Sequence, residues 1–84
     1  MKKVYIITID EVYDFENFPH EPMVFADEKK AREEMARIID EAKEEYKDKF
    51  NEVEEGETYF EMYAEGYFSE GHYALHLYEK EVEE

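Results

Sequence analysis

Hydrophobic residues change their spacing along the chain, and each spacing predicts an element. Residues 3–13 open with Val4-Tyr5-Ile6-Ile7-Thr8-Ile9, a β-branched and aromatic run without Gly or Pro that predicts a strand. Its apolar residues occur at both parities, so we expect it at a central or well-covered position of a sheet. Residues 14–22 contain two prolines and predict a loop, and residues 23–25 predict a short edge strand or an extended arm.

The spacing then becomes helical. Asp27 is the candidate N-cap, and we expect a helix from there to about Phe50. One apolar stripe at helical spacing supports it, formed by Ala31, Met35, Ile38, Ile39, Ala42, Tyr46 and Phe50. The segment from Asp27 to Phe50 holds nine acidic and seven basic residues, so the helix is nearly neutral and suits a scaffold that covers a sheet.

In the last third of the chain, apolar residues recur at every second position. Residues 51–56 predict an acidic loop, and residues 57–68 alternate as a strand does. The even set is expected to point inward and comprises Thr58, Phe60, Met62, Ala64, Gly66 and Phe68. The odd set points outward. Ser69-Glu70-Gly71 predicts a hairpin turn, and residues 72–82 predict a final strand with Tyr73, Leu75 and Leu77 on one face.

The predicted fold is therefore α+β, a single domain over residues 1–84. The element order is β-α-β-β, with one helix packed on one face of a small, mostly antiparallel sheet. We expect the C-terminal strand in the middle, where it pairs antiparallel with both others. With 84 residues the chain has room for one modest core.

The net charge of the chain indicates what kind of molecule it can bind. The chain carries 25 acidic and 10 basic side chains, a net charge of -15. Phosphates would be repelled, so DNA, RNA and an anionic membrane surface are not expected as direct ligands, and a basic protein surface is the natural complement. Residues 51–84 hold 11 acidic residues and one basic residue, so the negative charge is concentrated in the C-terminal hairpin and the loop before it. No secretory signal is recognisable, and a cytoplasmic location is expected.

Alternating Tyr and Glu residues make the hairpin the candidate interaction surface. Side chains two apart on one strand face are roughly 6.7 Å apart, a spacing at which carboxylates can meet a row of Lys and Arg. Tyr is a preferred interface anchor and can stack on Arg. The candidate partner-binding residues are Glu54, Glu55, Tyr59, Glu61, Tyr63, Glu65 and Tyr67. The alternative is an ordinary solvent face, in which such pairs only stabilise the sheet.

Catalysis and metal binding are not expected. The chain has no Cys, one Ser and two Thr, and no phosphate-binding glycine loop. His72 and His76 would lie about 13 Å apart on a strand, too far to share an ion. The acidic residues between 10 and 16 lack the Gly and closing Glu of a calcium loop. We therefore expect no enzyme, no metal and no cofactor.

The Val4-Tyr5-Ile6-Ile7 start, the single amphipathic helix and the closing aromatic-acidic hairpin resemble small proteins of bacteria and their phages. Within that group, acidic proteins of this size resemble phage inhibitors of host defence, including anti-CRISPR and anti-restriction proteins. The resemblance spans the whole chain through composition and element order. It implies an inhibitor that occupies a nucleic-acid-binding surface with carboxylates, and it transfers no functional residue to a position of this sequence.

Two further hypotheses stay open. A structural or assembly module could form a homodimer through the same Tyr-rich sheet face or an open edge, which light scattering at several salt concentrations would test. A designed chain would explain the Glu- and Lys-rich helix, but the irregular loop at 14–22 and the three His residues disfavour it.

Overall fold

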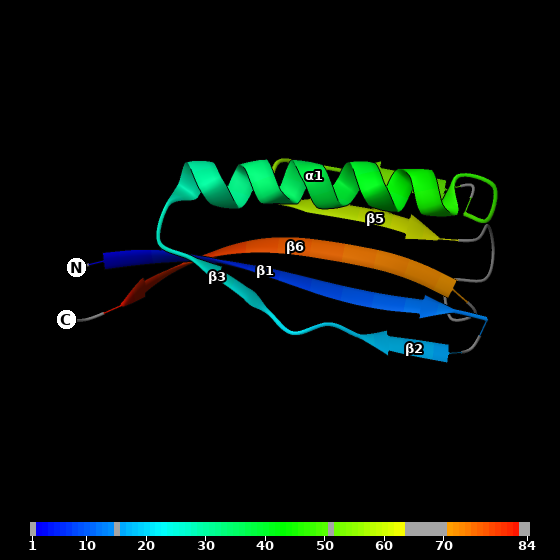
Figure 1. The fold of residues 1–84 in the computed structure, drawn as a ribbon, viewed down its shortest axis with the longest axis horizontal. Helices are drawn as coiled ribbons and strands as arrows, with labels where there is room; N and C mark the ends of the chain where they lie inside the picture. The colour runs from blue at the N-terminus through cyan, green and yellow to red at the C-terminus, as the bar shows by residue number, and fades with distance from the viewer. Residues whose placement is uncertain (1, 15, 51, 64–70, 83–84) are drawn as a thin grey trace.

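A computed structural model describes residues 2–14, 16–50, 52–63 and 71–82. The described elements, in chain order, are β1 (Lys2–Tyr13), β2 (Glu16–Pro19), β3 (Met23–Phe25), α1 (Glu28–Tyr46), β4 (Glu52–Glu55), β5 (Tyr59–Tyr63) and β6 (Gly71–Val82). Figure 1 shows α1 running along one side of the strands. The predicted α+β class, with one helix on a small antiparallel sheet, is confirmed.

The sheet has the order β2-β1-β6-β5-β4, with β3 also paired to β1. β6 lies between β1 and β5 and is antiparallel to both, as predicted. Its pairing with β1 runs the full length of both strands, from Lys2 opposite Val82 to Tyr13 opposite Gly71. The proposed turn before β6 falls on residues 69 and 70, which lie outside the described residues.

The two predicted loops are wrong in part, because each contains an edge strand. Within residues 14–22, β2 pairs with the end of β1, and within residues 51–56, β4 pairs with β5. Both strands are short and mostly exposed. An edge strand forms through backbone pairing on one side and needs no buried side-chain face, so hydrophobic periodicity does not reveal it.

The helix begins as predicted and ends earlier. Asp27 has extended backbone angles, and its side chain accepts a hydrogen bond of 2.8 Å from the backbone N of Lys29, which is the expected N-cap. α1 ends at Tyr46, and the backbone N of Lys49 and of Phe50 both donate to the Tyr46 carbonyl. Phe50 is nevertheless buried, with its ring stacked on that of Tyr46 at 4.5 Å. The apolar stripe therefore continues past the helix, through a turn.

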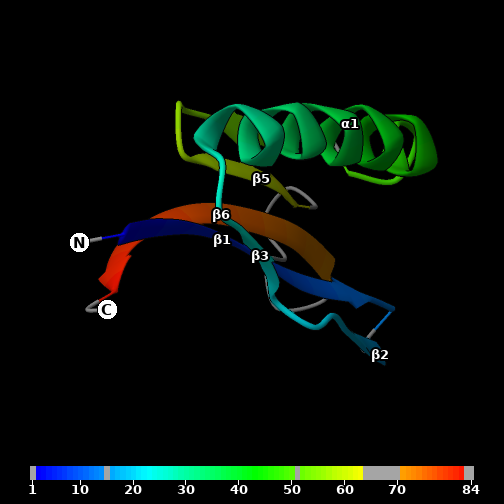
Figure 2. The ribbon, with the colours of Figure 1, turned by 60° about the vertical axis from the view of Figure 1, so that its left-hand side comes forward.

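The core lies between α1 and one face of the sheet. Residues of the helix stripe pack against Ile7 of β1, Phe60 and Met62 of β5, and alternate residues of β6. Phe60 and Met62 belong to the set predicted to point inward, and both are buried. Figure 2 shows that among the described elements α1 alone covers a face of the sheet. The opposite face is called the open face below.

Candidate functional site

One end of the open face gathers acidic and aromatic side chains from three strands. Residues paired across antiparallel strands share a face, so the register places Tyr59 beside His76, Glu61 beside Ala74 and Tyr63 beside His72. β4 adds Glu54 opposite Glu61 and Glu52 opposite Tyr63. Together with Asp10 of β1, which is opposite Ala74, these residues form the acidic sector, defined as Asp10, Glu52, Glu54, Tyr59, Glu61 and Tyr63.

The structure brings together four of the seven residues predicted to bind a partner: Glu54, Tyr59, Glu61 and Tyr63. Glu55 is separated from them, because its partner Phe60 faces the helix. The Glu55 carboxylate lies 3.3 Å from the ammonium nitrogen of Lys43 on α1. Glu65 and Tyr67, the remaining two, lie outside the described residues.

Negative charge in the acidic sector is weakly compensated. Glu54 and Glu61 are directly opposite each other, an arrangement of like charges that is unfavourable in a sheet. The charge of Glu54, then burial and the charge of Glu52, raise the pKa of the Tyr63 hydroxyl.

No Lys or Arg occupies the described strand positions that form the sector. The nearby basic groups are histidines, since His76 lies 3.7 Å from Glu61 and His72 lies 3.1 Å from Asp10.

The other end of the open face has a different character. The register places apolar Val4, Ile6, Val24, Tyr78 and Val82 there, together with Lys2 and Lys80, and we call this the apolar sector. Val24 and Tyr78 are 63% and 51% exposed. The open face therefore runs from an apolar, lysine-bearing end to an acidic, aromatic end.

A polar cluster on the helix side was missed by the sequence analysis. Glu11 of β1 is 8% exposed and is the charged residue buried in the core. One of its oxygens accepts a hydrogen bond from the hydroxyl of Tyr46, and the other lies 2.6 Å from Nε2 of His20. A signal was present in the sequence, because Glu11 is in phase with Tyr5, Ile7 and Ile9, which all face the helix. The alternation of inward and outward residues along this strand would have placed Glu11 in the core.

The three histidines lie beside three different carboxylates. His72 and His76 lie on β6 as predicted, each beside a different carboxylate, and His20 pairs with Glu11. Among the described residues, no group of three or more His, Cys, Asp or Glu side chains is arranged to hold a metal ion.

Comparisons of the chain with protein-family models, with curated proteins and with solved structures found no match. In the described part of the chain, no helix is both long enough and apolar enough to cross a membrane.

Proposed function

We propose that this chain is a protein-binding module, and that its acidic sector binds a basic surface with which the partner otherwise holds nucleic acid. The observation that carries the proposal is the Glu54–Glu61 cross-strand pair, left without a Lys or Arg within the described sector. Two like charges opposite each other weaken the sheet. A cationic group of a partner, placed between them, would turn this unfavourable electrostatic energy into a favourable one. The chain would then act as an inhibitor that competes with nucleic acid.

The aromatic residues give the sector more than charge. Tyr59 is 37% exposed and Tyr63 is partly buried, so their rings are available at the surface while remaining anchored in the strand. Tyr side chains bury a large area at small entropic cost, and their rings accept the face of an Arg guanidinium. Carboxylates would orient the basic partner and the rings would hold it.

The test is a pull-down from bacterial lysate at low and moderate salt, followed by competition with duplex DNA and with RNA. The test variant is Glu54→Gln/Glu61→Gln. The matched control is Glu33→Gln/Glu44→Gln on the exposed side of α1, which makes the same change in net charge at another place. We expect a partner that the control retains, the test variant loses, and nucleic acid or added salt releases.

Either of two results would reject the proposal. One is the absence of any salt-sensitive partner for the wild-type chain. The other is a partner bound equally by both variants, which would show that the carboxylates of Glu54 and Glu61 have no special role in holding it.

A second function, self-association, is favoured by the opposite character of the two sectors. A second copy docked on the open face with its strands reversed would set Lys80 of one copy near Glu61 of the other, and would cover Val24 and Tyr78. Light scattering would then give a dimer that Val24→Glu dissociates. A monomer at all salt concentrations would exclude this function.

A further inference from the structure

The outer edge of β4 has no neighbouring strand among the described residues. β4 ends the sheet order, and of the described strands it pairs with β5 alone. The backbone N of Gly56 donates to the carbonyl of Tyr59, so the backbone groups of Gly56 point toward β5. Because the direction of these groups alternates along a strand, the N–H and C=O of Val53 and of Glu55 point away from β5. They are available to a further strand.

The other edges of the described sheet suit an added strand less well. β2 contains Pro19, which lacks an N–H, and β3 has 3 residues. β6 passes beyond β5 at Tyr78, but this stretch carries Lys80. Proline, short length and lysine are the usual means by which proteins block strand edges. β4 has neither proline nor lysine, and its sequence is Glu-Val-Glu-Glu.

The charge of β4 decides which strand could join it. In a second copy paired antiparallel about Val53, Glu52 of each copy would lie opposite Glu54 of the other, and like charges in that position are unfavourable. Lys or Arg at the same positions would be favourable, because the described acidic sector supplies neither on this face. The edge therefore disfavours a second copy and favours a basic strand.

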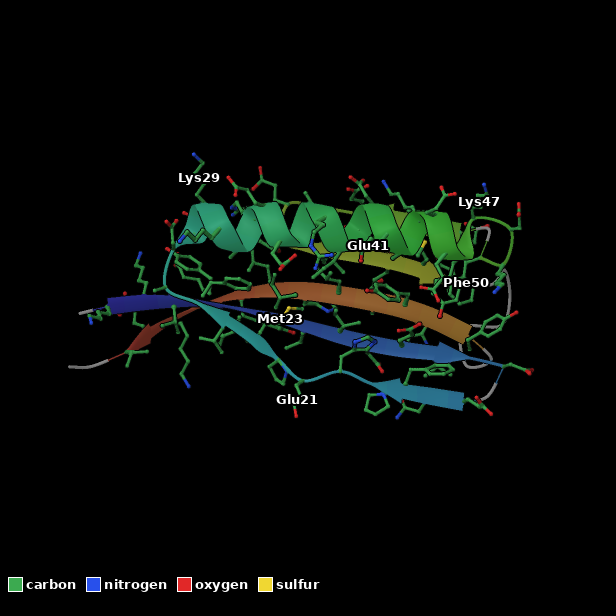
Figure 3. All side chains as sticks on the ribbon, in the orientation of Figure 1. Glu21, Met23, Lys29, Glu41, Lys47 and Phe50 are labelled. Carbon is green, nitrogen blue, oxygen red and sulfur yellow. The ribbon has the colours of Figure 1, made fainter. Side chains whose placement is uncertain are left out.

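The helix side of the same edge offers apolar surface. Val53 is 50% exposed there, and a pocket of about 240 Å³ lies between α1 and the end of β4. Met35, Ala36 and Ile39 of α1 form an apolar wall of this pocket. Figure 3 labels Glu41 on the near flank of α1, while β5 passes behind the helix. β4 follows β5 in the sheet order, so the pocket lies on the far flank of α1.

The cations around this pocket already have partners. Lys43 lies 3.3 Å from the Glu55 carboxylate. Arg32 lies 3.1 Å from the Glu28 carboxylate and donates to the carbonyl of Glu57 at 3.2 Å. A basic residue of an added strand would be repelled by these two cations on the helix side, whereas an apolar side chain would contact the apolar wall. The edge therefore selects basic residues for the open side and apolar residues for the helix side.

We propose that β4 accepts an extended segment of the partner as an added antiparallel strand, in which Lys or Arg alternates with apolar residues. The basic side chains lie beside Glu52 and Glu54 on the open face, and an apolar side chain lies on Val53 toward the pocket. Backbone hydrogen bonds to β4 supply affinity, and the alternation supplies specificity. The inference rests on the proposed function for the charge of the partner, and it names the kind of segment that the acidic sector holds.

The experiment adds the acetylated and amidated peptide Lys-Val-Lys-Val-Lys-Val to the isotope-labelled protein and follows amide chemical shifts and amide hydrogen exchange. We expect saturable shifts along β4 and slower exchange at Val53 and Glu55, whose N–H groups become hydrogen-bonded. The peptide N-methylated at its Val residues keeps every charge but cannot pair along β4, so it should bind at least about tenfold more weakly. The rearranged peptide Lys-Lys-Lys-Val-Val-Val, of the same composition, should also bind more weakly.

Two variants test the charge of the edge. Glu52→Gln/Glu54→Gln should weaken binding of the alternating peptide several-fold, as expected for the loss of two exposed ion pairs. Glu33→Gln/Glu44→Gln makes the same change in net charge on the exposed side of α1 and should bind the peptide like the wild type.

The added strand is rejected if no shift saturates, if the N-methylated peptide binds as tightly as its parent, or if exchange at Val53 and Glu55 is unchanged at saturation. Shifts confined to Tyr59, Glu61 and Tyr63, with unchanged exchange, would mean that a basic ligand lies across the open face. That result rejects the added strand and leaves the proposed function in place. The proposed function fails separately, in the pull-down, if the wild-type chain retains no salt-sensitive partner.

Discussion

Tyr46, the last residue of α1, donates a hydrogen bond from its hydroxyl to Oε2 of Glu11 in β1. The two residues are 35 positions apart in sequence, and both are buried. The bond gives the buried carboxylate one of its two partners, and His20 provides the other. It therefore fixes the end of the helix above one point of the sheet, in a core that is otherwise held by non-directional apolar contacts.

Tyr46→Phe should destabilise the fold by about 1–3 kcal/mol, the range for leaving a buried hydrogen-bonding group without a partner. The variant keeps the ring that stacks on Phe50, so a lower free energy of unfolding would be due to the missing hydroxyl. Urea unfolding followed by circular dichroism measures it. Tyr78→Phe, at a residue 51% exposed, is the matched control and should stay within about 0.5 kcal/mol of the wild type. Equal stabilities for the two variants would contradict the structural importance of the Tyr46–Glu11 bond.

Stability should fall at alkaline pH because of the same buried region. Burial and the charge of Glu11 raise the pKa of both Tyr46 and Tyr73 above the ordinary value of 10, that of Tyr73 to about 12. Above pH 10 the unfolded chain loses these protons while the folded chain keeps them, so unfolding becomes more favourable as pH rises. The contribution is complete below pH 10 and is lost as pH rises above 10, for Tyr73 up to about pH 12, by at most about 1.4 kcal/mol per pH unit for each group.

Urea unfolding at pH 9, 10 and 11 measures this loss. Tyr73→Phe should make the decline shallower, because one of the two buried groups is gone. Tyr78→Phe should leave the decline as it is in the wild type, since both buried tyrosines remain. A decline with the same slope in Tyr73→Phe would mean that Tyr73 does not contribute to it.

Gly71→Ala should destabilise the fold by about 1–3 kcal/mol, the usual range for overpacking a core. Gly71 is buried at the start of β6, and an added Cβ would lie 2.9 Å from Cε1 of Phe50 and 3.4 Å from the carbonyl oxygen of Val12. Gly56→Ala is the comparison, because its Cβ would meet the partly exposed ring of Tyr59, which can turn into solvent. We expect the smaller loss there, and thermal unfolding would compare the two.

Asp27→Ala should lower stability by about 1 kcal/mol through loss of the helix cap. Asp48→Ala is the control, an exposed aspartate just past the end of α1 where negative charge opposes the helix dipole. That variant should be neutral or slightly stabilising. Comparable losses in both variants would mean that the Asp27 side chain does not act as a cap.

The long elements could be predicted from the sequence because burial on one side leaves a period. β6 and α1 show that period, α1 adds the capping residue Asp27, and β1 was recognisable from its β-branched and aromatic run. β2 and β4 could not be predicted, because residues such as Asn17, Pro19, Glu54 and Glu55 join the sheet through their backbone while their side chains face solvent. The end of α1 was misplaced for a related reason, since Phe50 is buried without being helical.

The candidate site could be predicted only for residues that alternate between the two faces of a strand. Along β5, period two correctly separated the buried Phe60 and Met62 from Tyr59 and Glu61. Glu55 was placed with the wrong neighbours because a loop assigns no face to its residues, whereas β4 directs Glu55 to the helix side and Glu54 to the open side. The phase of Glu11 along β1 could have placed it inside, but its partners Tyr46 and His20 lie 35 and nine positions away in sequence, and no local pattern pairs them with it.

The central place of β6 has a consequence for synthesis of the protein. β1 with its edge strands and β5 with β4 are joined only through β6, which follows every other described strand in the chain. A nascent chain that has not yet reached Gly71 can form α1 and the short hairpins, but its sheet remains in two halves with unpaired inner edges. The fold is therefore completed after translation of its last strand, and until then a chaperone or a neighbouring nascent chain can pair with those edges.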